Sequence, residues 1–135
     1  MNKDTIFDYI LNNLTVAGAT IVREIPEEDE NENKSFPDFP LIEIVEGDDA
    51  EEIIANRQTQ HSQECDINLY TLNYTNSQIN DIVKTITNFF RNDYKLGGNC
   101  ILVSDVETLP TISTEGEMQQ TQITAIILYR ETFNV

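Results

Sequence analysis

TNSQINDIVKTITNFF, residues 75–90, is the stretch that decides the fold. Gln78 follows Thr75 at the spacing of a capping box, in which each side chain accepts a hydrogen bond from the other residue's backbone N–H. The apolar side chains then recur every three or four residues and form one stripe, at Ile79, Ile82, Val83, Ile86, Phe89 and Phe90. We therefore expect an amphipathic helix over residues 76–94, ended by the two glycines that follow it.

Strands are expected immediately before and after this helix. The alternation that starts at Cys65 gives residues 65–72 one apolar face, as in a partly buried strand. After the helix, residues 100–106 and 120–131 also have the composition of strands. The last of these carries apolar side chains on both faces, with Ile126 and Leu128 on the second, which predicts a central strand covered on both sides.

The first part of the chain predicts a helix and two strands. Residues 3–14 have helical apolar spacing, with Asn2 or Asp4 available as the N-cap, and residues 19–25 follow as a short strand. Residues 41–46 form the next strand, and Gly47-Asp48-Asp49 has the composition of a turn that closes it. The order α-β-β-β-α-β-β predicts one α+β domain over residues 1–135, with a mostly antiparallel β-sheet packed by two amphipathic helices. Its expected core contains Ile6, Phe7, Ile10, Leu11, Leu69, Ile79, Ile82, Val83, Ile86, Phe90, Ile101, Val103, Ile123 and Ile127.

Two long polar segments, residues 53–64 and 108–119, do not carry enough apolar side chains for a core of their own. For residues 53–64, an irregular arm and an exposed strand both fit the composition. Segments of this length without a core often order against a neighbouring protein. We therefore interpret both as candidate assembly arms, with contact residues Arg57, Gln58, Gln60, His61, Gln63, Thr114, Glu115 and Glu117.

The chain is strongly acidic, with 24 Asp and Glu against 8 Lys and Arg and a formal net charge of −16. This charge disfavours tight binding to phosphate backbones and to anionic membrane surfaces, both of which require bases. The acids concentrate in a loop at residues 26–38 and in a second cluster around the Gly47 turn. The candidate lumen-facing or partner-facing acids are Glu27, Glu28, Asp29, Glu30, Glu32, Asp48, Asp49, Glu51 and Glu52.

The sequence contains no arrangement typical of a catalytic or metal site. The single histidine, His61, lies in the most polar stretch and is expected at a surface or interface. Cys65 and Cys100 lack the CxxC spacing of zinc and redox sites, so two reduced, half-buried thiols are expected. The acidic runs also lack the spacing of an EF-hand loop. We expect no catalytic residues, no cofactor and no dedicated metal site, and hence a protein that is not an enzyme.

A resemblance to a known family spans nearly the whole chain. It rests on the order of the elements, on the helix at 79–90 and on three strand sequences: FPLIEI (39–44), DINLY (66–70) and QTQIT (120–124). The pattern resembles the tail-terminator or tail-completion (tail-to-head joining) proteins of long-tailed bacteriophages. The resemblance rests on order, length and composition rather than on a sharp motif.

This resemblance implies a structural protein of the virion, made in the bacterial cytoplasm and placed at the head-proximal end of the tail. The expected partners are further copies of the chain in a hexameric ring, the tail tube protein, and the head–tail connector or neck proteins. The ring would end tube polymerisation, and DNA would pass through its lumen without specific binding. An acidic lumen would repel phosphate and let DNA slide.

Two other functions remain open. The chain could be another head–tail adaptor or minor tail protein of the same virion. It could instead be an acidic DNA mimic that inhibits a nucleic-acid-binding enzyme. A mimic would be expected to spread its carboxylates along a regular face, whereas the acids here concentrate in expected loops and turns.

Overall fold

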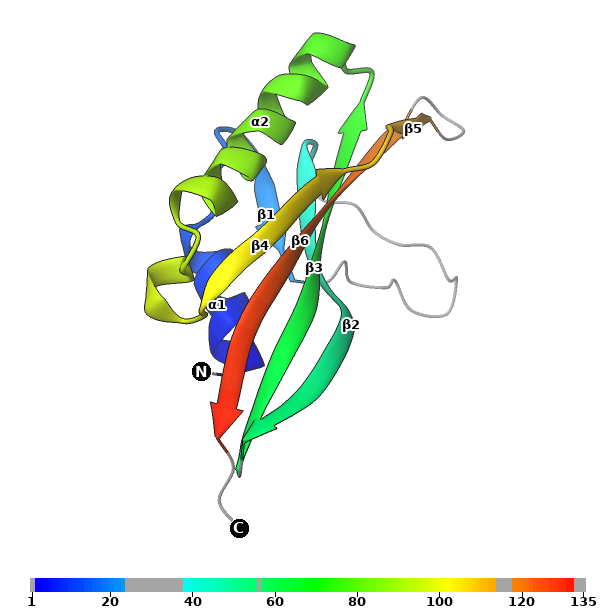
Figure 1. Cartoon of the computed structure of the whole chain (residues 1–135). Coiled ribbons are helices and arrows are strands. Elements are labelled where there is room, and N and C mark those ends of the chain that lie inside the picture. Colours follow the sequence, from blue (N-terminus) through cyan, green and yellow to red (C-terminus); the bar gives the residue numbers. More distant parts are fainter. Residues whose placement is uncertain (1, 24–37, 56, 114–117, 133–135) are drawn as a thin grey trace, which may run out of the picture.

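The protein, described by a computed structural model over residues 2–23, 38–55, 57–113 and 118–132, has an α+β fold (Figure 1). Two helices pack on a mostly antiparallel sheet, as the sequence predicts, and the described sheet has six strands. The elements are α1 (Lys3–Asn13), β1 (Thr20–Val22), β2 (Leu41–Ala55), β3 (Gln58–Leu72), α2 (Asn76–Asn92), the 3-10 turn η1 (Leu96–Gly98), β4 (Leu102–Thr108), β5 (Ile112–Ser113) and β6 (Met118–Thr132). The sheet has one strand more than the predicted order, because β5 is too short to show an alternating pattern.

The strands lie in the order β1-β2-β3-β6-β4, and β5 pairs with β6 beyond the end of β4. Among the described strand pairs, only β1–β2 is parallel. β3 and β6 pair antiparallel over 15 residues each, from Gln58 opposite Thr132 to Leu72 opposite Met118, without a register shift. β6 is therefore a central strand, as predicted.

Local capping signals explain where both helices begin. The Thr5 N–H donates to Asn2 Oδ1 at 2.8 Å, which makes Asn2 the N-cap of α1. The capping box of α2 is present in full, with the Thr75 N–H donating to Gln78 Oε1 and the Gln78 N–H to Thr75 Oγ1. α2 ends slightly earlier than predicted, because the Asp93 N–H closes the last turn on the Phe89 carbonyl and the chain then enters η1.

Both helices lie on one face of the sheet (Figure 1). The alternation of β3 and β6 places Cys65, Ile67 and Leu69 against this helical layer, together with the residues that pair with them on β6. Most of the predicted core is buried there, and the exceptions lie partly exposed at its rim: Leu11, Ile82, Val83, Ile101 and Val103.

The expectation that β6 is covered on both sides is wrong for the described part of the chain. Ile126 and Leu128 point to the face opposite the helices and stay partly exposed. No described helix packs on that face. Their apolar character thus marks an open surface of the sheet rather than a second covered layer.

The predicted turn at Gly47-Asp48-Asp49 is also wrong, because β2 continues through it to Ala55. The register with β3 shifts between Glu46 and Asp49. Gly47 and Asp48 therefore lie opposite the single residue Glu64 and form a β-bulge. A Cβ at Gly47 would lie 2.8 Å from the Glu64 Cβ, so glycine permits the close approach of the two strands at this point. Residues 53–55 and 58–64 consequently belong to the paired strands β2 and β3, so the strand interpretation of this segment holds for its described part and the irregular arm does not.

Replacing Ile86 with Ala tests the packing of α2. Ile86 is fully buried, so the truncation should lower the free energy of unfolding by about 2 to 5 kcal/mol through lost apolar contacts and the cavity left behind. Urea denaturation followed by circular dichroism measures this loss. Asn88→Ala, at an exposed position of the same helix, is the matched control and should change stability by less than about 0.5 kcal/mol. Equal stability of the two variants would contradict the placement of α2.

Candidate functional site

The most exposed part of the sheet is the β2–β3 hairpin, which extends beyond the two helices together with the end of β6 (Figure 1). Four of the predicted acids, Asp48, Asp49, Glu51 and Glu52, lie on β2 within this hairpin and are exposed. The structure therefore brings them together along one strand rather than in a turn. The other candidate acids lie outside the described residues: Glu27, Glu28, Asp29, Glu30 and Glu32. Of the predicted acidic loop 26–38, only Asp38 is described, and it is exposed.

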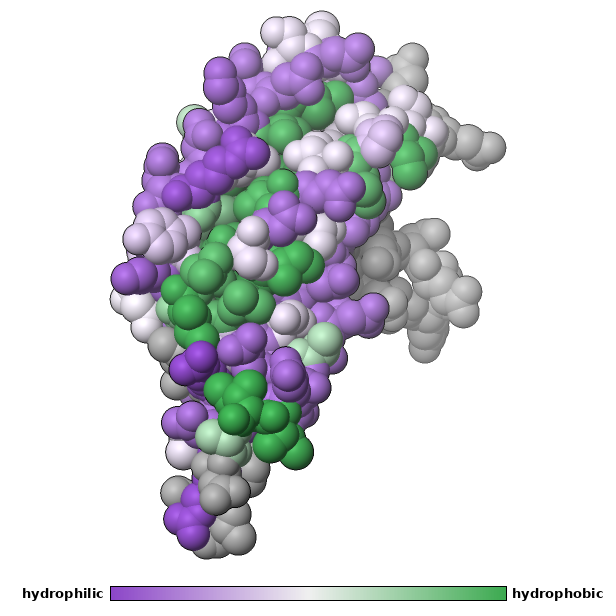
Figure 2. Space-filling model, in the orientation of Figure 1, coloured by the Kyte–Doolittle hydropathy of each residue, from purple (hydrophilic) through white to green (hydrophobic). Residues whose placement is uncertain are grey.

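The hairpin combines these carboxylates with exposed apolar side chains. Glu51 is opposite His61 and Glu52 is opposite Gln60, so successive acids lie on opposite faces of the hairpin. Ile53 follows with 77% of its surface exposed, and Ile54 is also exposed. Figure 2 shows apolar surface among hydrophilic residues at this end of the molecule. The end of β2 therefore carries two exposed aliphatic side chains directly after the four carboxylates.

His61 lies in the distal part of the hairpin, opposite Glu51, but it is buried, so the expectation of a surface histidine is wrong. Its ring stacks on Tyr129 of β6, with centroids 4.5 Å apart and planes 4° from parallel. Nδ1 lies 2.8 Å from Asp49 Oδ2, and Nε2 lies 3.1 Å from Thr59 Oγ1. Both ring nitrogens thus have partners, and only 6% of the residue surface is exposed. Sequence reasoning missed this because the stack joins residues far apart in the chain.

Buried polar side chains stabilise the bulge from the same face. Gln63 Nε2 donates to the backbone carbonyls of Gly47 at 3.0 Å and Glu64 at 2.9 Å. The stacked Tyr129 has its pKa raised to about 12, first by burial and then by Asp49 and other nearby carboxylates. These contacts hold the hairpin in shape and leave His61 without access to a substrate, so the cluster is structural.

The candidate arm residues therefore divide into groups. Arg57 is exposed at the tip of the hairpin with a φ of 65°, while Gln58 and Gln60 are partly exposed on β3. His61 and Gln63 are buried in the protein's own sheet. Thr114, Glu115 and Glu117 lie outside the described residues. Within the 108–119 segment, the described part includes β5, which pairs with β6.

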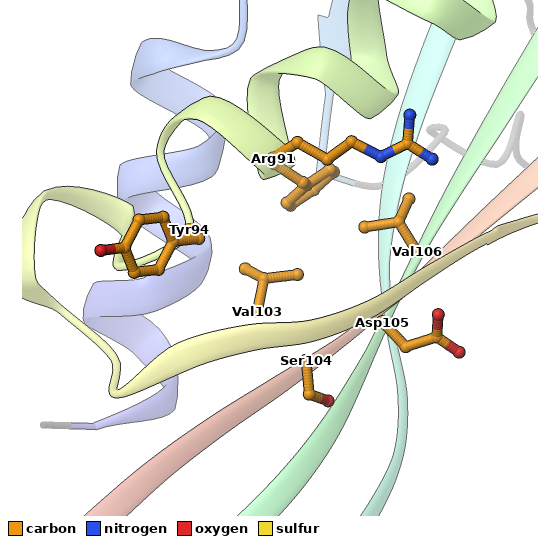
Figure 3. Close-up of a pocket in the computed structure, with 7 residues that line it drawn as sticks. Arg91, Tyr94, Val103, Ser104, Asp105 and Val106 are labelled. Atoms are coloured by element: carbon orange, nitrogen blue, oxygen red, sulfur yellow. The ribbon is translucent and has the colours of Figure 1, made fainter.

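A second surface feature, not predicted from the sequence, lies between α2 and the edge strand β4. Seven residues line a hollow of about 320 Å³: Phe90, Arg91, Tyr94, Val103, Ser104, Asp105 and Val106 (Figure 3). Figure 3 shows Val103 and Val106 rising from β4 toward α2, with the Arg91 side chain on the opposite side. The hollow forms because the edge of the sheet is only partly covered by the helix.

The two thiols of the chain lie in the interior of the protein. Cys65 and Cys100 are both buried, and burial raises the pKa of each thiol, that of Cys100 to about 11. Both thiols are therefore protonated and weakly nucleophilic at neutral pH. They are more deeply buried than expected, and Cys100 lies between η1 and β4 rather than on a strand. In the described parts of the chain, no group of three or more His, Cys, Asp and Glu side chains is arranged to hold a metal ion.

The chain matches no protein-family model and no curated protein sequence. The described helices include none with the length and apolar character needed to cross a membrane.

Asp49 should matter for stability, unlike Asp48 next to it, because its carboxylate is the partner of a buried histidine. Asp49→Ala leaves His61 Nδ1 without this partner, which should cost about 1 to 3 kcal/mol of unfolding free energy. Asp48→Ala deletes an exposed carboxylate and should change stability by less than about 0.5 kcal/mol. Chemical denaturation at pH 7 measures both. Equal effects would show that the Asp49–His61 contact does not stabilise the hairpin.

Proposed function

We propose that this protein is a structural subunit of a bacteriophage tail, which caps the tail tube as a ring, ends its polymerisation and forms the interface to the head–tail connector. It acts through protein contacts, without a catalytic step or cofactor. The observation that carries the proposal is the hairpin, where Ile53 and Ile54 are exposed among carboxylates at the end of the sheet. The proposed location is the head-proximal end of the virion tail, after assembly in the bacterial cytoplasm.

The one-sided packing of the sheet supports an assembly role. On the face away from the helices, Val45, Leu102, Ile126 and Leu128 are partly exposed. Leu102, Ile126 and Leu128 are neighbours on this face, and adjacent exposed apolar residues favour a site that another protein covers. A ring subunit needs two such surfaces, because head-to-tail contacts join different patches of neighbouring copies. The open sheet face and the hairpin can supply these two patches.

The charge supports the second part of the proposal, a lumen through which DNA passes. Asp48, Glu51 and Glu52 are exposed on the hairpin, so they are available to face a lumen. Repeated around a ring, such carboxylates would repel phosphates and keep DNA from adhering. The same charge opposes self-association in solution, and salt screens it over about 8 to 10 Å. Ring formation should therefore strengthen with salt and with a tube as template.

The alternatives differ in which surface they use. An adaptor or minor tail protein would use the same hairpin and sheet face without ending tube growth. A DNA mimic would use the carboxylates alone. The hairpin acids lie on both faces of β2 and are followed by two exposed isoleucines, an arrangement that fits a protein contact better than the imitation of a phosphate row.

Ile53→Asp should weaken capping of the tube. The purified protein, added to polymerising tail tube protein of the same virus, should shorten the tubes measured by electron microscopy. Ile53→Asp places a charge in the proposed contact and should restore long tubes without unfolding the domain, because Ile53 packs little in its own chain.

Leu72→Asp is the matched control, since it makes the same kind of change at an exposed aliphatic residue at the other end of β3. It should still shorten the tubes. If the wild-type protein leaves tube length unchanged at any salt concentration, the capping function is refuted. If both variants act like the wild type, the hairpin is not the contact.

A further inference from the structure

β4 leaves one edge of the sheet open. It pairs with β6 on one side, and no other described strand pairs with it. The Leu109 N–H donates to the Gln122 carbonyl at 2.9 Å, and antiparallel alternation then directs the backbone groups of Val106 and Thr108 away from β6. The start of the strand is closed instead, because the Val103 N–H donates to the Tyr94 carbonyl. The segment from Val106 onward can therefore accept another strand.

Apolar surface lies beside this open edge. The hollow lined by Phe90, Val103 and Val106 lies on its α2 side (Figure 3). Tyr94 is 50% exposed at one end of the edge, and Ile112 of β5 is 63% exposed at the other. Figure 2 shows apolar residues along the boundary between α2 and β4. Natural proteins usually protect an edge strand by covering it or by avoiding exposed apolar side chains, so this combination favours a partner.

The charges at the edge determine which partner fits. Asp105 and Glu107 are exposed and lie opposite Ile126 and Thr124, on the sheet face away from the helices. A strand added to β4 would place one row of side chains beside these acids, where bases form favourable cross-strand pairs. Its other row would lie over the apolar hollow. Arg91 extends along that hollow toward Val106, so a base in this second row would meet a like charge (Figure 3).

We infer that the β4 edge binds an extended segment of a different protein in which aliphatic and basic side chains alternate, added as a further strand. Main-chain hydrogen bonds to Val106 and Thr108 would supply part of the affinity, and the alternating side chains would supply the specificity. A second copy of this chain is a poorer occupant. Edge-to-edge pairing of two copies would bring Asp105 and Glu107 of each together, and each chain carries a net charge of −16. The inference does not depend on the proposed tail function.

The test uses a short labelled peptide in which valine and lysine alternate, and a second peptide with glutamate in place of lysine. Fluorescence anisotropy should show binding of the lysine peptide alone, and amide chemical shifts should change at residues 105–109. In the double variant Asp105→Lys/Glu107→Lys, affinity for the lysine peptide should fall by at least about tenfold and the glutamate peptide should bind. Asp8→Lys/Asp38→Lys makes the same change of net charge near the opposite edge and should weaken binding by less than about threefold.

Backbone pairing is tested separately at Thr108. Thr108→Pro removes an outward N–H that β6 does not use, and should weaken binding, whereas Thr108→Val should not. Equal losses in the two charge-reversed double variants would show non-specific attraction and overturn the inference. So would shifts confined to other strands, or sedimentation showing that the edge joins two copies of the chain. Should Thr108→Pro fail to fold, the exchange of peptide preference still decides the outcome.

Discussion

The pairing of β3 with β6 is the interaction on which the rest of the structure depends. The two strands run together over 15 residues each without a register shift. A shift of one residue would move every core side chain of a strand to the opposite face, so this register decides which face the helices cover. It places Ile67 opposite Ile123 in the core and, further along, His61 against Tyr129. The pairing of β3 with β6 therefore positions both the apolar core and the polar residues around His61 in the hairpin.

The same ladder explains why the hairpin keeps its shape beyond the helices. There the sheet has no described helix to cover it, and Asp49, Thr59, His61 and Gln63 make hydrogen bonds that replace apolar packing. Both ring nitrogens of His61 have partners, and a buried polar group whose hydrogen bonds are all formed favours a unique arrangement. Ile53 is consequently held out in solvent at the end of a supported strand, instead of folding back onto the core.

Signals that act over a few residues allowed much of the fold to be predicted. Thr75 and Gln78 marked the start of α2, and the alternation from Cys65 identified β3 and its buried face. Features that require long-range pairing were missed. Gly47 has the composition of a turn but permits a bulge, and its role depends on the nearby Glu64, which only the register reveals.

The candidate site was predicted less well than the fold for the same reason. The polarity of residues 53–64 indicated exposure, but His61 and Gln63 find partners on other strands and are buried. The hollow beside β4 could not be foreseen, because it arises from how α2 lies against the sheet edge. The exposed acids of β2 were identified from composition alone, since a local cluster of like charges is seldom buried.

We propose that the hairpin, the open sheet face and the β4 edge serve assembly at the end of a phage tail. These surfaces lie at separate places on the domain. The hairpin is at one end of the sheet, whereas the β4 edge runs along its side (Figure 1). A ring subunit that contacts both its neighbours and another component requires such separate surfaces. Under this proposal, cryo-electron microscopy of intact tailed virions that contain the protein tests the claim most directly. The account predicts density for this fold as a closed ring between the tail tube and the head connector, with the β2 acids facing the lumen. Density for the fold along the tube wall, or none at the head-proximal end, would contradict it.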